Sequence, residues 1–204
     1  MTYDQIITRF ITDRRKGASG ERGCFNSLPS LRHAIRHAAL CHWLPSMKRH
    51  PHQWRIPGAA LREAERRLQR LASRLRRCED FDSLHEEVAR SIGPIPRIGD
   101  LTIYDIAHRI GAYLGKPPCL VYLHRGTRLG ARHLGFSGAT LDPNVLPPAF
   151  SRLSPEEIED CLCIYKGELA GLPGQRRRLS ECVTSQAARC HSRRDVARRR
   201  GRIC

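Results

Sequence analysis

The stretch IPRIGDLT, residues 95–102, decides the fold of the middle of this chain. Pro96 and Gly99 favour a tight turn, and the apolar-periodic run that follows predicts a helix over residues 101–114. The turn therefore delivers the backbone into the N-terminus of a helix. The first N–H groups of a helix have no partner within it, and together with the positive end of the helix dipole they attract an anion such as a phosphate.

On both sides of this turn, apolar residues recur at helical intervals over most of the chain. Only 6% of the residues are aromatic, alternating Val, Ile and Thr runs are scarce, and Leu, Ala and Arg recur at helical intervals. The clearest helix is expected over residues 59–78, where apolar residues lie three and four positions apart and arginines occupy the other faces. Further helices are expected over residues 27–43 and 126–135, from a capping box of Ser83 and Glu86, and from a start signal of Ser154 and Glu157 to Gly171. Asp100 is expected to cap the helix over residues 101–114. We therefore predict an all-α fold.

Length and composition favour one helical domain with a terminal arm. A chain of 204 residues with 40% apolar content can bury one core and at most a second small one. We expect residues 1–25 to form a mobile N-terminal segment, with a short amphipathic helix before a Gly/Arg-rich loop, and residues 26–173 to form the helical domain. Residues 174–204 are rich in Arg and lack apolar periodicity, so we expect a disordered tail there.

The charge of the chain points to a polyanionic partner. The formal net charge is +16, and the segment after Pro173 contains ten arginines against Glu181 and Asp195, so half of the excess lies in the tail. Such a charge fits nucleic acid, with an acidic membrane surface as the alternative. Low aromatic content and the lack of an apolar run of about 18 residues argue against a membrane.

The cysteines and histidines predict neither a disulfide framework nor a metal site. Nine cysteines is an odd number, and no apolar targeting segment follows the charged N-terminus, so we expect a reducing, cytoplasmic location. His33, His37 and Cys41 recur every four residues on one predicted helix. The ends of that stripe are separated by about 12 Å of helical rise, too far for all three to hold one ion.

The segment from Ser83 to Leu114 resembles the helix-hairpin-helix DNA-binding motif, and its continuation to Gly135 is similar to DNA glycosylases of the endonuclease III type. The hairpin of that family has the form apolar-Pro-Gly-apolar-Gly, then two residues, then Thr-Ala. Residues 95–99 match four of these five positions, and Thr102 stands where the family has Thr. The departure is Arg97, which replaces the first Gly.

The resemblance implies a mode of DNA binding. Backbone N–H groups around Gly99 and Leu101, with the neighbouring Thr102, would bind a phosphate of duplex DNA. Arg97 would contact the phosphate itself, and hairpin carbonyls could hold a monovalent cation. Contacts of this kind position a protein on DNA without reading its sequence. A hairpin that serves protein contacts, or one that is only a structural turn, stays open as an alternative.

The resemblance does not carry over a catalytic residue. Leu101 stands where the bifunctional enzymes of the family have a nucleophilic Lys, and Tyr122 stands where they have Asp, although His124 matches. The spacings of Cys161, Cys163, Cys182 and Cys190 do not match the iron–sulfur loop of some members. A divergent glycosylase or lyase that uses Asp105 or Asp100 stays open. Asp105, His108, Arg109 and His124 could form an acid–base set, but their spacing alone does not bring them together.

Two further basic segments are candidates for DNA contact. Arg62, Arg66 and Arg70 lie on the polar side of the helix expected over residues 59–78, and Lys48 and Arg49 precede Trp54 in a loop. The alternatives are a solvated basic face, a coiled-coil or protein-binding seam over Leu61–Leu75, and a Trp that pins the loop to the core. The sequence therefore predicts non-catalytic DNA binding with little sequence preference.

Overall fold

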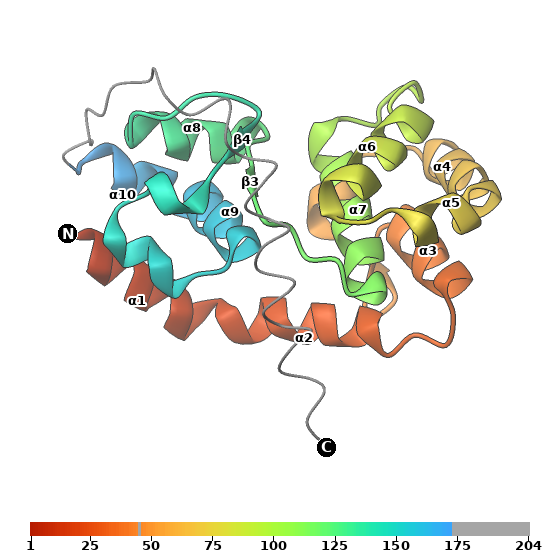
Figure 1. Cartoon of the computed structure of the whole chain (residues 1–204), viewed down its shortest axis with the longest axis horizontal. Coiled ribbons are helices and arrows are strands. Elements are labelled where there is room, and N and C mark those ends of the chain that lie inside the picture. The colour runs from red at the N-terminus through yellow and green to blue at the C-terminus, as the bar shows by residue number, and fades with distance from the viewer. Residues whose placement is uncertain (45, 173–204) are drawn as a thin grey trace.

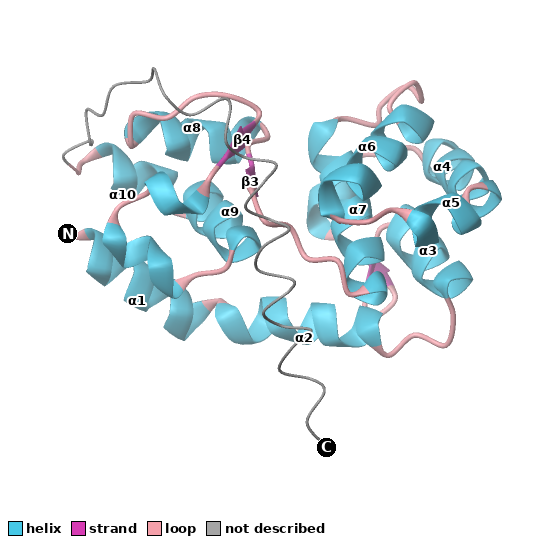
Figure 2. Ribbon diagram, viewed as in Figure 1, coloured by secondary structure: helices cyan, strands magenta, loops and turns pink. Residues whose placement is uncertain are grey.

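The structure, a computed structural model, describes residues 1–44 and 46–172, without the side chains of residues 16–19 and 52. Within these residues it is an all-α protein, as expected, with a few short strands and 3-10 turns (Figure 2). The predicted disordered tail lies outside the described residues. Among the described helices, none is both long and apolar enough to cross a membrane.

The helices are α1 (Tyr3–Asp13), α2 (Arg15–Asn26), α3 (Leu31–Ala39), α4 (Gly58–Arg70), α5 (Ala72–Arg77), α6 (Phe81–Ile92), α7 (Asp100–Leu114), α8 (Arg125–His133), α9 (Pro155–Ile164) and α10 (Lys166–Ala170). Two antiparallel ribbons join β1 (His42–Trp43) to β2 (Lys48–Arg49) and β3 (Val121–Tyr122) to β4 (Thr140–Leu141). The 3-10 turns are η1 (Pro51–Gln53), η2 (Pro143–Val145) and η3 (Pro148–Arg152).

The described residues bury two separate apolar clusters, which define two lobes. The hairpin lobe contains α3 to α7, and the α9 lobe contains α1, α8, α9, α10 and the β3–β4 ribbon. Figure 1 shows the lobes side by side, with α2 running along the lower edge of both. The expectation of a single main core therefore gives way to two cores, and α7 faces the boundary between them.

The N-terminal residues belong to both lobes, which corrects the expectation of a mobile segment. Ile6, Ile7 and Phe10 are fully buried in the α9 lobe, and Phe25 is fully buried in the hairpin lobe. Helix α2 covers the Gly/Arg-rich stretch that was expected to be a loop. Arg15 holds Glu157 of α9 through its Nε at 2.7 Å from Oε1. Tertiary contacts of this kind offset the low helix propensity of the glycines.

The helix expected over residues 59–78 is divided in two. Leu61, Ala64 and Leu68 are buried as the periodicity predicts, but α4 ends at Arg70 and α5 begins at Ala72. The interruption lies at Leu71, whose N–H bonds to the carbonyl of Leu68 in a tighter turn. The arginines after Arg70 therefore belong to a separate short helix.

Other helix boundaries follow caps that differ in part from the expected ones. Helix α6 begins at a capping box of Asp80 and Ser83 rather than of Ser83 and Glu86. The N-cap of α7 is Gly99, not Asp100, and no side chain caps that helix. The helix expected from residue 27 to 43 is shorter, because Ser30 caps α3 and β1 follows it. The capping box at Ser154 is confirmed, but Tyr165 separates α9 from α10.

Candidate nucleic-acid interface and interlobe cavity

The hairpin between α6 and α7 keeps the backbone geometry of a tight turn although it lacks the first Gly. The N–H of Ile98 donates to the carbonyl of Ile95 at 3.1 Å, and Pro96 occupies the second position of this turn. Arg97 has φ 75°, in the left-handed region that favours glycine. A side chain there costs about 1 kcal/mol. The buried side chains of Ile95 and Ile98 anchor the turn on either side of this residue.

The start of α7 presents unpaired donors to solvent. Among the described residues, no hydrogen-bond acceptor faces the N–H groups of Gly99, Asp100 or Leu101. Gly99 is exposed, and a Cβ built on it would meet no atom within 4 Å. These amides are therefore open and not turned into the core. The carboxylate of Asp100 lies in the first turn and adds negative charge on one flank.

The other hairpin residues predicted to contact DNA differ in their exposure. Arg97 is exposed, and Leu101 is half-buried at the wall of a cavity. Thr102 is only 6% exposed, so its side chain faces the core and is not available for contact. The periodicity of α7 accounts for this, because Thr102 shares the buried face with Ile106 and Arg109.

Two of the predicted arginines converge at the start of α4. A Cβ built on Gly58 would lie 3.1 Å from Nη1 of Arg62 and 3.8 Å from Nη2 of Arg49. The first turn of α4 has neither an acidic residue nor a side-chain cap. Arg66 and Arg70 are also exposed on α4, but Arg66 donates to Glu63 from both Nε and Nη2. Its charge is therefore partly neutralised.

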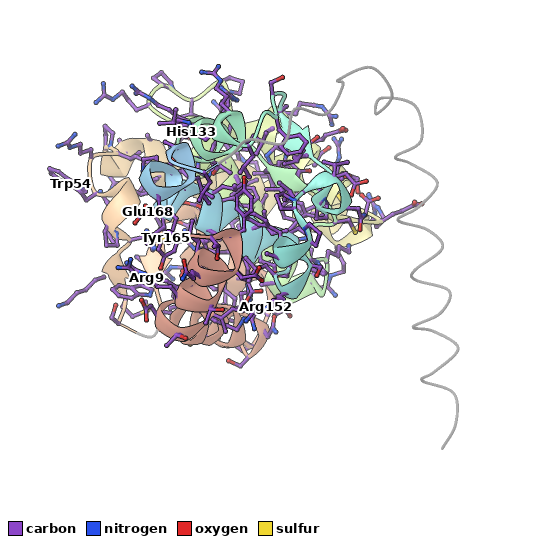
Figure 3. All side chains as sticks on the ribbon, turned by 90° about the vertical axis from the view of Figure 1, so that its left-hand side faces the viewer. Arg9, Trp54, His133, Arg152, Tyr165 and Glu168 are labelled. Carbon is purple, nitrogen blue, oxygen red and sulfur yellow. The ribbon has the colours of Figure 1, made fainter. Side chains whose placement is uncertain are left out.

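The loop after β2 is anchored by a residue that the sequence did not single out. Lys48 and Arg49 form the exposed strand β2, and Trp54 is 63% exposed, at the edge of the molecule in Figure 3. The guanidinium of Arg55 lies 4.8 Å from the centre of the Trp54 ring. Gln53, which is fully buried, instead donates a hydrogen bond to Asp105 of α7. The alternative in which Trp54 pins the loop to the core is therefore wrong.

A cavity of about 390 Å³ lies between the two lobes. Helices α2, α7 and α9 and the residue that precedes α8 form its polar wall, and Leu101 and His50 also line it. The titratable wall residues include Glu21, Arg22, Tyr104, Asp105, His108, Arg109, His124, Glu156, Glu159 and Asp160. Tertiary structure thus brings together the four residues Asp105, His108, Arg109 and His124, which sequence spacing left apart.

The acidic side chains of α9 are the part of the cavity that sequence reasoning missed. Glu159 is buried, contacts Nε2 of His124, and accepts a hydrogen bond from Oγ1 of Thr127 at 2.7 Å. Asp160 lines the same wall. The available signal was an unusual density of carboxylates between Pro155 and Ile164, a helix that also has an apolar face.

Burial shifts the pKa values of several side chains that line this cavity. Desolvation raises the pKa of Asp105 to about 6, and the charge of Glu159 adds to the rise. Desolvation and the charges of Glu159 and Asp105 raise the pKa of Asp160 to about 8. Desolvation lowers the pKa of His108 to about 3. Burial in this cavity therefore favours the uncharged forms of Asp105, Asp160 and His108.

No group of three or more His, Cys, Asp or Glu side chains in residues 1–44 and 46–172 is arranged to hold a metal ion. No protein-family model matches the chain, and neither the curated proteins nor the solved structures contain a match to it. The two positions at which the resemblance expects catalytic groups lie on different hollows. Leu101 lines the interlobe cavity, whereas Tyr122 lines a second hollow and donates to Asp82 at 2.7 Å.

Proposed function

We propose that this protein binds the phosphate backbone of duplex DNA through its hairpin, with little dependence on base sequence. The observation that carries the proposal is the backbone at residues 97–101. Arg97 holds a left-handed conformation at φ 75°, and the exposed N–H groups that follow have no acceptor among the described residues. Strained backbone of this kind persists where the surrounding structure enforces it, and it concentrates at functional sites.

Charge around the hairpin and the first lobe supports the proposal. The guanidinium groups of Arg49 and Arg62 converge at the uncapped start of α4, where a second phosphate would find two cations and free helix donors. Arg97 and Lys48 are exposed. The formal net charge of +16 supplies the long-range attraction that raises the rate of association with a polyanion.

Trp54 supports a contact at the edge of the nucleic acid rather than inside a groove of regular duplex. The ring is mostly exposed and already carries the guanidinium of Arg55 on one face. An aromatic ring in a cationic surrounding stacks on an unpaired or terminal base, a contact worth about 1–3 kcal/mol and tolerant of base identity.

The test is a titration of a fluorescently labelled random-sequence duplex, read as anisotropy at several salt concentrations. If about eight phosphates are engaged, log K should fall against log salt with a slope on the order of −7. Gly99→Asp places a carboxylate where the phosphate is expected, and the site has room for it because no atom lies within 4 Å of the new Cβ. We expect the affinity of this variant to fall about tenfold or more.

The matched control is Gly167→Asp, which makes the same change of charge at an equally open position in α10. Its affinity should stay within about twofold of the parent protein, because one distant charge contributes little at physiological salt. A slope between 0 and about −2, or equal losses in the two Asp variants, would refute backbone binding by the hairpin.

A further inference from the structure

Two side chains of the cavity wall carry a buried polar atom that lacks a hydrogen-bond partner among the described residues. These atoms are Nη1 of Arg109 and Oε2 of Glu156. Oε1 of Gln53, which contacts Asp105 but does not line the cavity, also lacks a partner. Arg109 is 6% exposed, so solvent does not reach its side chain freely. An unsatisfied buried polar group costs about 1–3 kcal/mol, and folded proteins contain few of them. Two in one cavity wall point to a site that a ligand completes.

Each of these side chains is held in place by its remaining polar atoms. Nε of Arg109 donates to Oε1 of Glu21 at 3.1 Å, and Nε2 of Gln53 donates to Asp105. Oε1 of Glu156 lies 3.2 Å from Nη1 of Arg22. The orphaned atoms therefore cannot rotate away without breaking an existing bond. The cavity wall therefore presents one fixed orphaned acceptor, on Glu156, and one fixed orphaned donor, on Arg109.

The carboxyl groups of the cavity add acceptors that have no full counter-charge. Desolvation is the largest effect on the pKa of Asp105 and raises it, the charge of Glu159 raises it further, and the charge of Arg109 opposes the rise without cancelling it. Arg109 is already paired with Glu21, and His124 with Glu159. The thiol of Cys41, beside Arg109, is neutral because burial raises its pKa to about 12. A ligand that brings N–H donors to Asp105 would relieve this excess of negative charge.

The remaining wall is aromatic and suits a flat ligand. The rings of Tyr104 and His108 are parallel within 3°, with centroids 5.7 Å apart, and the ring of His124 lies 6.2 Å from that of Tyr104. Burial holds His108 neutral, so its ring offers an uncharged face. A volume of about 390 Å³ is within the range of small-ligand pockets and has ample room for one planar heterocycle.

We propose that the interlobe cavity binds a planar amino-heterocycle, a ring that carries an exocyclic amine beside a ring nitrogen. The amine donates to Asp105 and to Oε2 of Glu156, Nη1 of Arg109 donates to the ring nitrogen, and the ring packs against Tyr104. This chemistry is shared by free amino-heterocycles and by amino-bearing bases of nucleic acid. The proposal does not depend on DNA binding by the hairpin.

The test compares two matched pairs of probes by calorimetry on the full chain: adenine with purine, and aminopyrimidine with pyrimidine. Each pair differs by the exocyclic amine alone. We expect the amine-bearing member of at least one pair to bind about tenfold or more tightly, because the unsubstituted ring leaves buried acceptors unpaired. This comparison uses the parent protein alone, so it does not require a variant that folds.

Asp105→Asn tests the assigned residue with little change of shape. We expect it to abolish most of the preference for the amine, and Asp82→Asn, in the second hollow, to leave that preference unchanged. Thermal unfolding confirms that both variants are folded. The proposal is overturned if neither probe pair shows a preference for the amine and no DNA-borne amine binds, or if Asp105→Asn and Asp82→Asn reduce the preference equally.

A second experiment distinguishes a free amino-heterocycle from a base of nucleic acid as the ligand. A duplex with one unpaired adenine is compared with a duplex with one unpaired purine at the same place, for the parent protein and for Gly99→Asp. Preference for the free amine that survives Gly99→Asp supports a small-molecule ligand. Preference seen only in DNA, and lost in Asp105→Asn, supports a base as the ligand.

Discussion

Helix α7 carries two candidate sites of different chemistry, one made of backbone groups and one made of side chains. At Gly99 and Leu101 the backbone of α7 presents exposed N–H donors. One and two turns later, the same helix presents the carboxyl of Asp105 and the guanidinium of Arg109 to a cavity between the lobes. The first site depends on main-chain atoms and on the turn that exposes them. The second depends on side chains supplied by α2, α7 and α9, from distant parts of the sequence.

The two sites differ in how well they tolerate amino-acid substitutions. A backbone donor survives most substitutions of its own residue, whereas a cavity of paired charges fails when one partner moves. We therefore expect the hairpin site to be local and the cavity to depend on the packing of the α9 lobe.

The largest expected effect comes from separating α8 from α9 within the α9 lobe. A Cβ at Gly130 of α8 would lie 2.1 Å from the carbonyl oxygen of Leu162 in α9, so Gly130→Ala forces these helices apart. We expect urea unfolding to show a loss of about 3 kcal/mol or more. Gly167→Ala, at an open helical position, should be neutral or stabilise by up to about 1 kcal/mol. Equal stability of the two variants would contradict the close packing of α8 and α9.

The next prediction tests whether the two sites on α7 act separately. Gly99→Asp should lower affinity for duplex DNA about tenfold or more and leave calorimetric binding of adenine or aminopyrimidine within about twofold. Asp105→Asn should do the reverse. The measurement is the pair of binding constants for each variant, and parallel losses in both would mean that the sites form one unit.

The protonation of Asp160 predicts a pH dependence of stability. Its folded pKa of about 8 exceeds its ordinary value of 3.8, so the folded chain keeps a proton that the unfolded chain has released. The free energy of unfolding should therefore fall as pH rises toward 8, by up to about 1.4 kcal/mol per pH unit for one proton. Between pH 6.5 and 8, above the ordinary pKa of His108, this decrease is not masked by that histidine.

Asp160→Asn should flatten this slope in urea unfolding measured across the same window. The control is Asp13→Asn, because the side chain of Asp13 is largely exposed on α1. That variant should keep the slope of the parent protein. An unchanged slope in Asp160→Asn would show that the carboxyl of Asp160 is ionised in the folded chain.

The smallest expected effect concerns the strain at Arg97. Arg97→Gly should raise the free energy of unfolding by up to about 1 kcal/mol, because glycine adopts a φ of 75° without steric cost. Arg97→Ala removes the same charge but keeps the strain, so it should give no such gain. Both should weaken DNA binding by a similar, small factor. Equal stabilities of the Gly and Ala variants would contradict a strained turn.

Local signals predicted the elements of this fold well where they are complete within a few residues. The apolar spacing of Leu61, Ala64 and Leu68 predicted a buried helix face, and Ser154 with Glu157 predicted a helix start. They failed at Leu71 and in the Gly/Arg-rich stretch of α2. In both places contacts with distant helices, and not propensity, decide the backbone.

The candidate sites divide in the same way. The turn at Pro96 and Gly99 could be identified from sequence because its geometry depends on residues that are adjacent in the chain. Asp105 and His124 were noted as carboxylate and imidazole without a shared location. Their meeting with Gln53, Glu159 and Asp160 depends on how two lobes pack, and no spacing along the chain encodes that distance.

By itself, the sequence determined that this chain is helical and strongly basic, with a tight turn before residue 100, because helix periodicity, charge and turn chemistry are local properties. Tertiary structure alone decided that two lobes exist, that the N-terminal helices join them, and that buried carboxyls face one another across a cavity. The physical reason is that desolvation and pairing of these groups arise only when segments far apart in sequence exclude water together.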